Sequence, residues 1–188
     1  WDMEIEPKFN SPEMAPIQLN RLKTMLGRLN AGAPFYTRLF GENKIDPEKI
    51  NSFAEFKEKV PLFDKKSLLE LLGECGGDVV KTIDQIIPIP VDDLDWFATT
   101  TGTTGVPTPY PMTNNDVHNI WGAVMTRGGW RAGVRKADRV LFCFALSMVS
   151  AGVPTRIGFQ KLGVTMLHVG AEAKSERILM MQGLVRGH

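Results

Sequence analysis

The residues best suited to chemistry lie in one short segment, from Thr99 to Thr108. Its sequence, TTTGTTGVPT, combines six threonines with two glycines. Glycine accepts positive φ angles and lets its backbone N–H approach a ligand closely. Backbone N–H groups and hydroxyls donate hydrogen bonds, whereas the oxygens of an ionised phosphate only accept them. The segment is therefore a candidate phosphate-binding loop.

Two widespread phosphate-binding motifs do not fit this segment. A Walker A loop requires a lysine after its second glycine, and here a valine stands there. The spacing of the glycines also differs from the Gly-x-Gly-x-x-Gly dinucleotide motif. The residues alone leave a second interpretation open, in which the segment is a threonine-rich hairpin whose glycines only make the turn.

The sequence contains no cluster typical of a metal site. Cys75 and Cys143 have no metal ligand beside them, and Cys143 lies in an apolar run typical of a core strand. His118 and His168 likewise lack a cysteine or carboxylate at ligand spacing. We therefore predict that the chain supplies no metal site, and the sequence identifies no catalytic residue.

Three arginines, Arg127, Arg131 and Arg135, recur every four residues and so share one face of a helix. One interpretation is contact with the phosphates of CoA. A solvated helix face with cations near its C-terminus explains them without any ligand, and we favour that interpretation.

The first half of the chain is predicted to be helical. Ser11-Pro12-Glu13 combines an N-cap hydroxyl, a proline and an acid, and predicts a helix start. An apolar stripe follows at spacings of three and four residues, formed by Leu19, Leu22, Leu26 and Leu29. Further short helices are predicted after the cap-like residues Asp46, Ser52 and Asp64.

From about residue 90 the pattern changes to strands and helices. Extended arms at residues 95–101 and 107–112 flank the threonine-glycine loop. The sequence Thr113-Asn114-Asn115-Asp116 has the form of a capping box, which predicts a helix to about Arg131. Strands at 140–144 and 164–169 then alternate with helices at 150–162 and 173–184. We therefore expect an α/β fold, with a helical region at residues 1–90 and, at 91–188, the first part of a mostly parallel sheet with covering helices.

Composition narrows the functional classes. A formal net charge of +1 gives no indication of a nucleic-acid partner. The longest nearly apolar run, residues 140–149, is far shorter than the ~20 residues that span a bilayer, and we expect neither a membrane partner nor a signal peptide. With only two cysteines, a cytoplasmic location is the simplest expectation. The chain begins at Trp1 and stops just after a predicted helix, so we expect both ends to be cut.

The loop resembles the signature of the adenylate-forming, acyl-CoA synthetase superfamily. Thr100 to Thr108 is similar to its Ser/Thr-Ser/Thr-Gly-Thr-Thr-Gly-x-Pro motif, and Thr108 stands where many members have lysine, as is typical of the phenylacetate-CoA ligase branch. Further segments resemble that branch in order along nearly the whole chain, namely Trp1–Glu6, Gln18–Leu22, Ala33–Tyr36, Ser52–Phe56, Val60–Lys65, Ala137–Val140 and Leu162–Thr165.

The resemblance implies an ATP-dependent, AMP-forming ligase whose nucleotide-binding domain starts in residues 91–188. Such enzymes join a carboxylic acid to ATP as an acyl-adenylate, and the thiol of CoA then displaces AMP. By resemblance, the phosphates of ATP would be held by Thr100, Thr101, Gly102, Thr103, Thr104 and Gly105. Mg²⁺ is implied as a charge-neutralising ion. The family's adenine motif, ribose-binding aspartate and C-terminal domain lie beyond residue 188, so we expect the isolated chain to be inactive.

The substrate and the acceptor stay open at this point. An aryl or arylalkyl acid is implied by the resemblance, but Phe144-Ala145-Leu146 stands where the family has an aromatic-Gly-aromatic stretch bordering its acyl pocket. Phe144 and Leu146 are thus either substrate-binding residues or core residues. The acceptor is CoA or, in an alternative enzyme, a protein or polysaccharide-pathway group. A non-catalytic nucleotide-binding or interaction module is a third hypothesis, and exposed apolar surface would favour oligomerisation, such as a homodimer.

Overall fold

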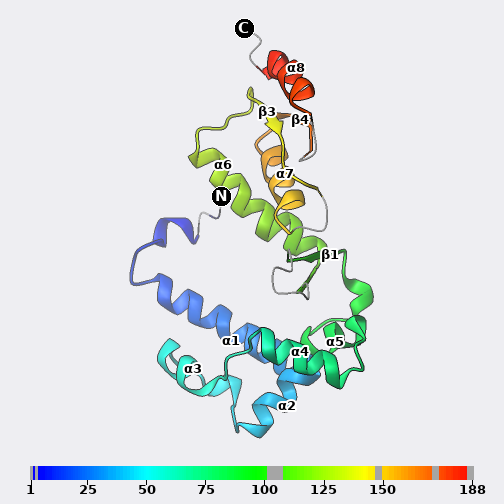
Figure 1. The fold of residues 1–188 in the computed structure, drawn as a ribbon. Helices are drawn as coiled ribbons and strands as arrows, with labels where there is room; N and C mark the ends of the chain where they lie inside the picture. The colour runs from blue at the N-terminus through cyan, green and yellow to red at the C-terminus, as the bar shows by residue number, and fades with distance from the viewer. Residues whose placement is uncertain (1, 3, 101–107, 147–149, 171–173, 186–188) are drawn as a thin grey trace. The chain divides into compact units, whose positions relative to one another are not determined.

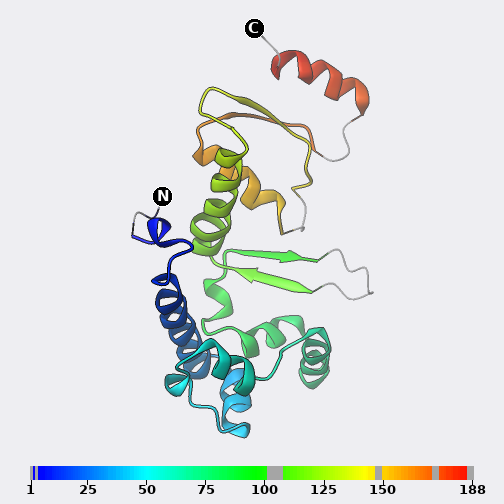
Figure 2. The ribbon, with the colours of Figure 1, turned by 90° about the vertical axis from the view of Figure 1, so that its left-hand side faces the viewer.

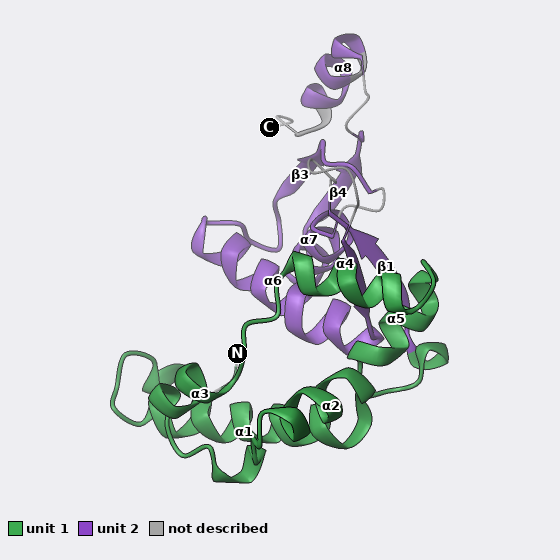
Figure 3. Cartoon of the chain, turned by 60° about the horizontal axis from the view of Figure 1, so that its bottom comes forward, with its two compact units in different colours: residues 1–93 green, residues 94–188 purple. Residues whose placement is uncertain are grey.

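The protein was studied as a computed structural model, which describes residues 2, 4–100, 108–146, 150–170 and 174–185. The chain divides into two compact units, Trp1–Asp93 and Leu94–His188, shown in green and purple in Figure 3. We describe each unit by itself. The assignment of residues 1–90 and 91–188 to separate functional domains stays a prediction.

The regular elements of unit 1 among its described residues are all helices (Figure 1). Five α-helices are joined by loops and short 3₁₀ turns. In chain order the elements are η1 (Glu6–Lys8), α1 (Met14–Gly32), α2 (Pro34–Glu42), η2 (Pro47–Lys49), α3 (Phe53–Lys59), α4 (Lys65–Glu74), α5 (Val79–Ile86) and η3 (Val91–Asp93).

The predicted helix starts at Asp46, Ser52 and Asp64 are confirmed. Each side chain accepts a hydrogen bond from a backbone N–H two or three residues downstream, with distances of 3.0 Å from Glu48, 3.1 Å from Glu55 and 2.9 Å from Ser67. Such bonds satisfy N–H groups that have no partner within the helix. They also stabilise the charged carboxylate. The hydrogen bonds from Lys49 and the Glu48 N–H lower the pKa of Asp46, and the Ser67 N–H lowers that of Asp64.

One prediction for unit 1 was wrong in detail, and one helix was missed. Helix α1 begins at Met14 rather than directly after Ser11, because the Ser11 hydroxyl accepts from the Glu13 N–H, 3.3 Å away, in a local turn. Helix α5 was not predicted, although Asp78 caps it by accepting from the Lys81 N–H at 3.1 Å. This bond lowers the pKa of Asp78.

The core of unit 1 lies where α1 and α2 pack together. Leu26, Phe40 and Ile50 are buried there, with exposed fractions of 3% or less. Leu26 belongs to the predicted leucine stripe. Tyr36 packs beside Phe40 with ring centroids 6.0 Å apart, and burial raises the pKa of its phenol.

Unit 2 contains all the described strands, in two small sheets (Figure 2). Its elements in chain order are β1 (Trp96–Thr99), β2 (Pro109–Met112), η4 (Asp116–Trp121), α6 (Gly122–Arg131), β3 (Arg139–Phe142), α7 (Gly152–Lys161), β4 (Thr165–His168) and α8 (Ser175–Val185). Strands β1 and β2 pair antiparallel, whereas β3 and β4 pair parallel with α7 as the crossover between them.

The fold class was predicted correctly only in part. The described chain is mostly helical, and its parallel sheet consists of β3 and β4 alone, in register Phe142 with His168. The two arms around the threonine-glycine loop form a separate antiparallel hairpin rather than joining that sheet. Among the helices of the described residues, none combines the length and apolar character needed to cross a bilayer.

The capping box after the hairpin is confirmed, but the helix it starts is not uniform. The Asp116 carboxylate accepts from the Thr113 N–H at 2.9 Å, and the Thr113 hydroxyl accepts from the Asp116 N–H at 3.2 Å. The first turns, η4, form a π-helix, in which the Gly122 N–H donates to the Val117 carbonyl five residues earlier. Regular α-helix starts only at Gly122.

Candidate phosphate-loop hairpin and neighbouring site

The candidate phosphate loop is carried by the β1–β2 hairpin. Beyond the last strand pair, the Thr100 N–H donates to the Thr108 carbonyl and the Thr108 N–H donates to the Thr100 hydroxyl, each at 3.0 Å. Thr100 and Thr108 therefore extend the pairing of the two arms by one step beyond the strands. The other predicted phosphate contacts lie outside the described residues, namely Thr101, Gly102, Thr103, Thr104 and Gly105.

The inner face of the hairpin packs against helical residues of the same unit. Ala98 of β1 and Met112 of β2 form a buried cluster with Val117 of η4 and Ile157 of α7. The exposed fraction of these four side chains is between 0 and 9%. Because the cluster joins both strands to two helices, the base of the hairpin is held on a packed scaffold.

Helices α6 and α7 lie side by side (Figures 1 and 2) and approach closely at glycines. A Cβ added to Gly158 would lie 2.5 Å from Met125 Cβ and 2.7 Å from the Gly122 carbonyl oxygen. The Thr126 hydroxyl lies 2.8 Å from the Gly122 carbonyl and 3.0 Å from the Gly158 carbonyl, and so links the two helices. Glycine at 158 thus permits a backbone-to-backbone contact.

The predicted acyl-pocket residues lie just after β3. Phe144 and Leu146 are 47% and 44% exposed within this chain, and their assignment as substrate-binding residues stays a prediction. The Phe144 ring lies 6.3 Å from that of Phe142, which in turn meets the His168 ring edge-on at 5.7 Å. Phe142 and His168 end the paired strands, and the carboxyl ends of parallel strands are where open α/β folds bind ligands.

Of the three arginines predicted to share a helix face, Arg135 has a structural role. Arg135 donates from Nη1 to the carbonyls of Trp130 and Val134, at 2.8 and 2.9 Å. Its guanidinium also lies 3.7 Å from the centre of the Trp130 ring. Arg135 therefore caps the end of α6, as expected for a cation near a helix C-terminus.

One residue that the sequence analysis did not single out is Arg156 of α7. Its Nε is a buried nitrogen with no hydrogen-bond partner in the described part of the chain. Buried polar atoms are nearly always paired, so this atom requires an explanation. In sequence, the only signal was one arginine in a segment with no other charged residue, from Val153 to Gln160.

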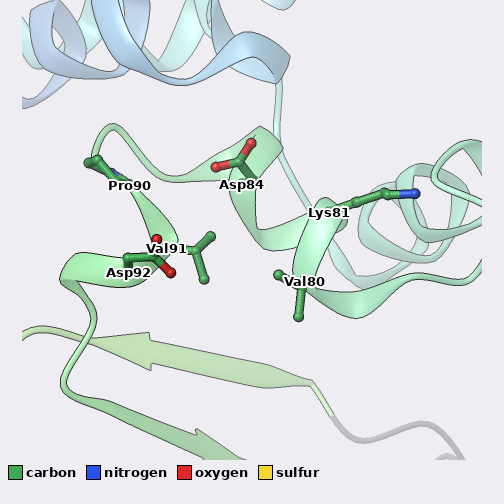
Figure 4. A pocket seen from close by; sticks show the side chains of 6 residues that line it. All are labelled: Val80, Lys81, Asp84, Pro90, Val91 and Asp92. Carbon is green, nitrogen blue, oxygen red and sulfur yellow. The ribbon is translucent and has the colours of Figure 1, made fainter.

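A shallow pocket in unit 1 has no loop rich in hydrogen-bond donors and no metal-binding cluster among its lining residues (Figure 4). It has a volume of about 280 Å³ and is lined by Val80, Lys81, Asp84, Pro90, Val91 and Asp92. The Lys81 side chain extends away from the other five residues and pairs with Asp78 at 3.6 Å. Across the described ranges of both units, no group of three or more His, Cys, Asp or Glu side chains could hold a metal ion.

Sequence comparison finds relatives among curated ligases. The chain is 24% identical over 182 residues to phenylacetate-coenzyme A ligase of Aromatoleum evansii, which covers 96% of the chain and 38% of that protein. It is 24% identical over 155 residues to the phenylacetate-coenzyme A ligase of Escherichia coli K12, covering 82% of the chain and 33% of the relative. The chain thus spans about a third of the length of these relatives. No protein-family model matches it.

Solved structures of a CoA ligase share the fold. A 2-hydroxyisobutyryl-CoA ligase in complex with 2-HIB-AMP superposes with a TM-score of 0.75 and 22% identity, over 92% of this chain and 34% of that one. An open conformation of the same ligase, with 2-HIB-AMP and CoA, also gives a TM-score of 0.75, over 92% and 38%. The chain therefore has the fold of the N-terminal region of acyl-CoA ligases, and it is a distant homologue of the phenylacetate-CoA ligases.

Proposed function

We propose that the protein containing this chain is an ATP-dependent, AMP-forming ligase that activates a carboxylic acid and transfers the acyl group to CoA. The observation that supports this most is the similarity to phenylacetate-CoA ligases, which extends over up to 96% of the chain. The hairpin adds to it, because Thr100 and Thr108 pair at the point from which the threonine-glycine segment extends.

In this proposal the loop binds the β- and γ-phosphates of ATP while the acid attacks the α-phosphate. The attack releases pyrophosphate and forms an acyl-adenylate, whose carbonyl carbon then accepts the CoA thiolate as AMP leaves. The loop residues contribute by holding the phosphates in position and by donating hydrogen bonds to their negative charge. Mg²⁺ would neutralise further charge, but the described residues gather no metal-binding group, so no step here is assigned to it.

For the acid, we propose an aryl or arylalkyl carboxylate that borders on Phe144 and Leu146. Both side chains are partly exposed beside the Phe142–His168 ring pair, so apolar and aromatic surface is available at the ends of the parallel strands. The segment between them has alanine where the family has glycine, which would narrow the space for a bulky acid.

The test is carboxylate-dependent exchange between ATP and radiolabelled pyrophosphate. We would assay the intact protein and this chain with a panel of aryl, arylalkyl and fatty acids. We expect exchange by the intact protein and none by the chain, which matches only about a third of the length of its relatives. A folded intact protein that exchanges pyrophosphate with no acid in the panel would overturn the proposal.

A further inference from the structure

Arg156 is a cation that the described part of unit 2 leaves without a partner. Its buried Nε–H donates to no hydrogen-bond acceptor there, and no described carboxylate lies within ion-pair distance of its guanidinium. Arg156 as a whole is only partly buried, but its Nε–H is removed from water without an acceptor, which is unfavourable unless a ligand supplies one.

Among the described residues of unit 2, three of the four acids have hydrogen-bond partners other than Arg156, and no ion pair to Arg156 is found for the fourth, Glu176. Asp95 accepts a hydrogen bond from the Asn114 amide at 3.3 Å, and Asp116 accepts two from Thr113. Asp138 accepts from the Arg135 N–H at 2.7 Å. Glu176 lies in the first turn of α8, where an acid suits the helix dipole. The described acids of this unit therefore provide no counter-ion for Arg156.

The position of Arg156 on α7 associates it with the proposed acyl site. Arg156 lies four residues after Gly152, so the two share a helix face. Gly152 in turn packs so closely that an added Cβ would clash with the Ala145 carbonyl, between Phe144 and Leu146. The next residue, Ile157, belongs to the cluster under the hairpin. Arg156 thus occupies the stretch of α7 between the hairpin and the segment after β3.

We propose that Arg156 binds an oxyanion, namely the carboxylate of the acid that the ligase activates. This inference rests on the proposed function and deepens it. A guanidinium presents its Nε–H and one Nη–H as a planar fork that matches the two oxygens of a carboxylate. A phosphate group of ATP offers the same chemistry. The proximity of α7 to Ala145, beside the proposed acyl-pocket residues, favours the acid.

The direct test is NMR of the arginine Nε–H groups in the ¹⁵N-labelled chain. The variant Arg156→Lys keeps the charge but removes the Nε–H, so the resonance missing from its spectrum is that of Arg156. We would titrate the wild-type chain with phenylacetate and, separately, with pyrophosphate. We expect a saturable shift of this resonance with phenylacetate and little change with pyrophosphate. A shift with pyrophosphate alone would assign Arg156 to a phosphate, and no shift with either would also overturn the proposal.

A second measurement separates binding from structure. In the intact protein, Arg156→Met should raise the KM for the acid about tenfold or more and leave the KM for ATP nearly unchanged, because a hydrogen-bonded charge pair is lost on one substrate only. In the chain, the same variant should not lower the melting temperature, since no described group pairs with the arginine. Arg131→Met, which removes an exposed arginine from α6, is the matched control. A markedly lower melting temperature for Arg156→Met than for the control would show a structural arginine and refute the inference.

The two proposals fail in different ways. If the intact protein exchanges no pyrophosphate with any acid but phenylacetate still shifts the Arg156 resonance, the ligase function is wrong and the carboxylate site stands. If exchange is found and Arg156→Met changes neither substrate's KM, the function stands and the role of Arg156 is refuted.

Discussion

The contact between α6 and α7 gives the sharpest prediction, because adding one methyl group at Gly158 should force the helices apart. In Gly158→Ala the new Cβ would lie 2.5 Å from Met125 Cβ, 2.7 Å from the Gly122 carbonyl oxygen and 2.8 Å from the Thr126 nitrogen. Ordinary contacts of a Cβ start at 3.4 Å, so the helices must separate by roughly 0.9 Å. Two of the three atoms belong to the backbone and cannot rotate away.

The expected destabilisation follows from two opposing terms. Overpacking of this kind costs about 1–3 kcal/mol, and backbone obstacles place Gly158→Ala at the upper end of that range. Alanine recovers about 1 kcal/mol of helix propensity. The net loss in the free energy of unfolding is then about 2 kcal/mol, which lowers the melting temperature of a unit of this size by roughly 8–16 °C.

Gly128→Ala is the matched control, since an added Cβ on that residue of α6 has nothing within 4 Å. It should raise the stability by about 0.8–1.0 kcal/mol through helix propensity alone. Both variants can be followed by urea unfolding with tryptophan fluorescence, because three of the four tryptophans lie in unit 2. Equal stabilisation by the two substitutions would show that α6 and α7 do not make this backbone contact.

Three further predictions concern the loop, nucleotide binding and pH. Thr101→Ala and Thr104→Ala should each lower pyrophosphate exchange by the intact protein about tenfold or more, because each removes a hydrogen-bond donor to a charged group. The control Thr165→Ala, at an exposed strand residue, should leave the exchange rate unchanged. Equal exchange rates for all three variants would exclude the loop from catalysis. The isolated chain should bind ATP with a millimolar Kd or weaker. A few loop contacts of about 1.5–3 kcal/mol each barely exceed the ~4–15 kcal/mol cost of association. A micromolar Kd in calorimetry would contradict this prediction. Unit 1 should lose stability in acid, because the capping carboxylates Asp46, Asp64 and Asp78 have lowered pKa values. Their contribution to the free energy of unfolding is complete above the ordinary aspartate pKa of about 3.9. It is lost as the pH falls through the lowered pKa values. Asp64→Asn, which keeps a neutral cap, should flatten the acid side of a pH series of melting temperatures, and an unchanged profile would refute the assignment.

Local signals allowed much of the fold to be predicted. The caps at Asp46, Ser52 and Asp64 and the capping box at Thr113 act within three residues along the chain, so they can be read from the sequence alone. The hairpin arms could be predicted for the same reason, because a glycine-rich segment between two extended runs favours antiparallel pairing. The family resemblance was likewise carried by short motifs, and the similarity to the ligases supports it.

Other features depend on contacts between residues far apart in the chain. Three features arise only when distant segments pack together. They are the pairing of β3 with β4, the ring contact of Phe142 with His168, and the burial of the Arg156 Nε on α7. The sequence by itself indicated most of the short helices and strands, and it predicted which segment is the candidate phosphate loop. Only the tertiary structure decided where two helices meet at Gly158 and that the Arg156 Nε is buried without a partner among the described residues, because both features depend on contacts between separate segments.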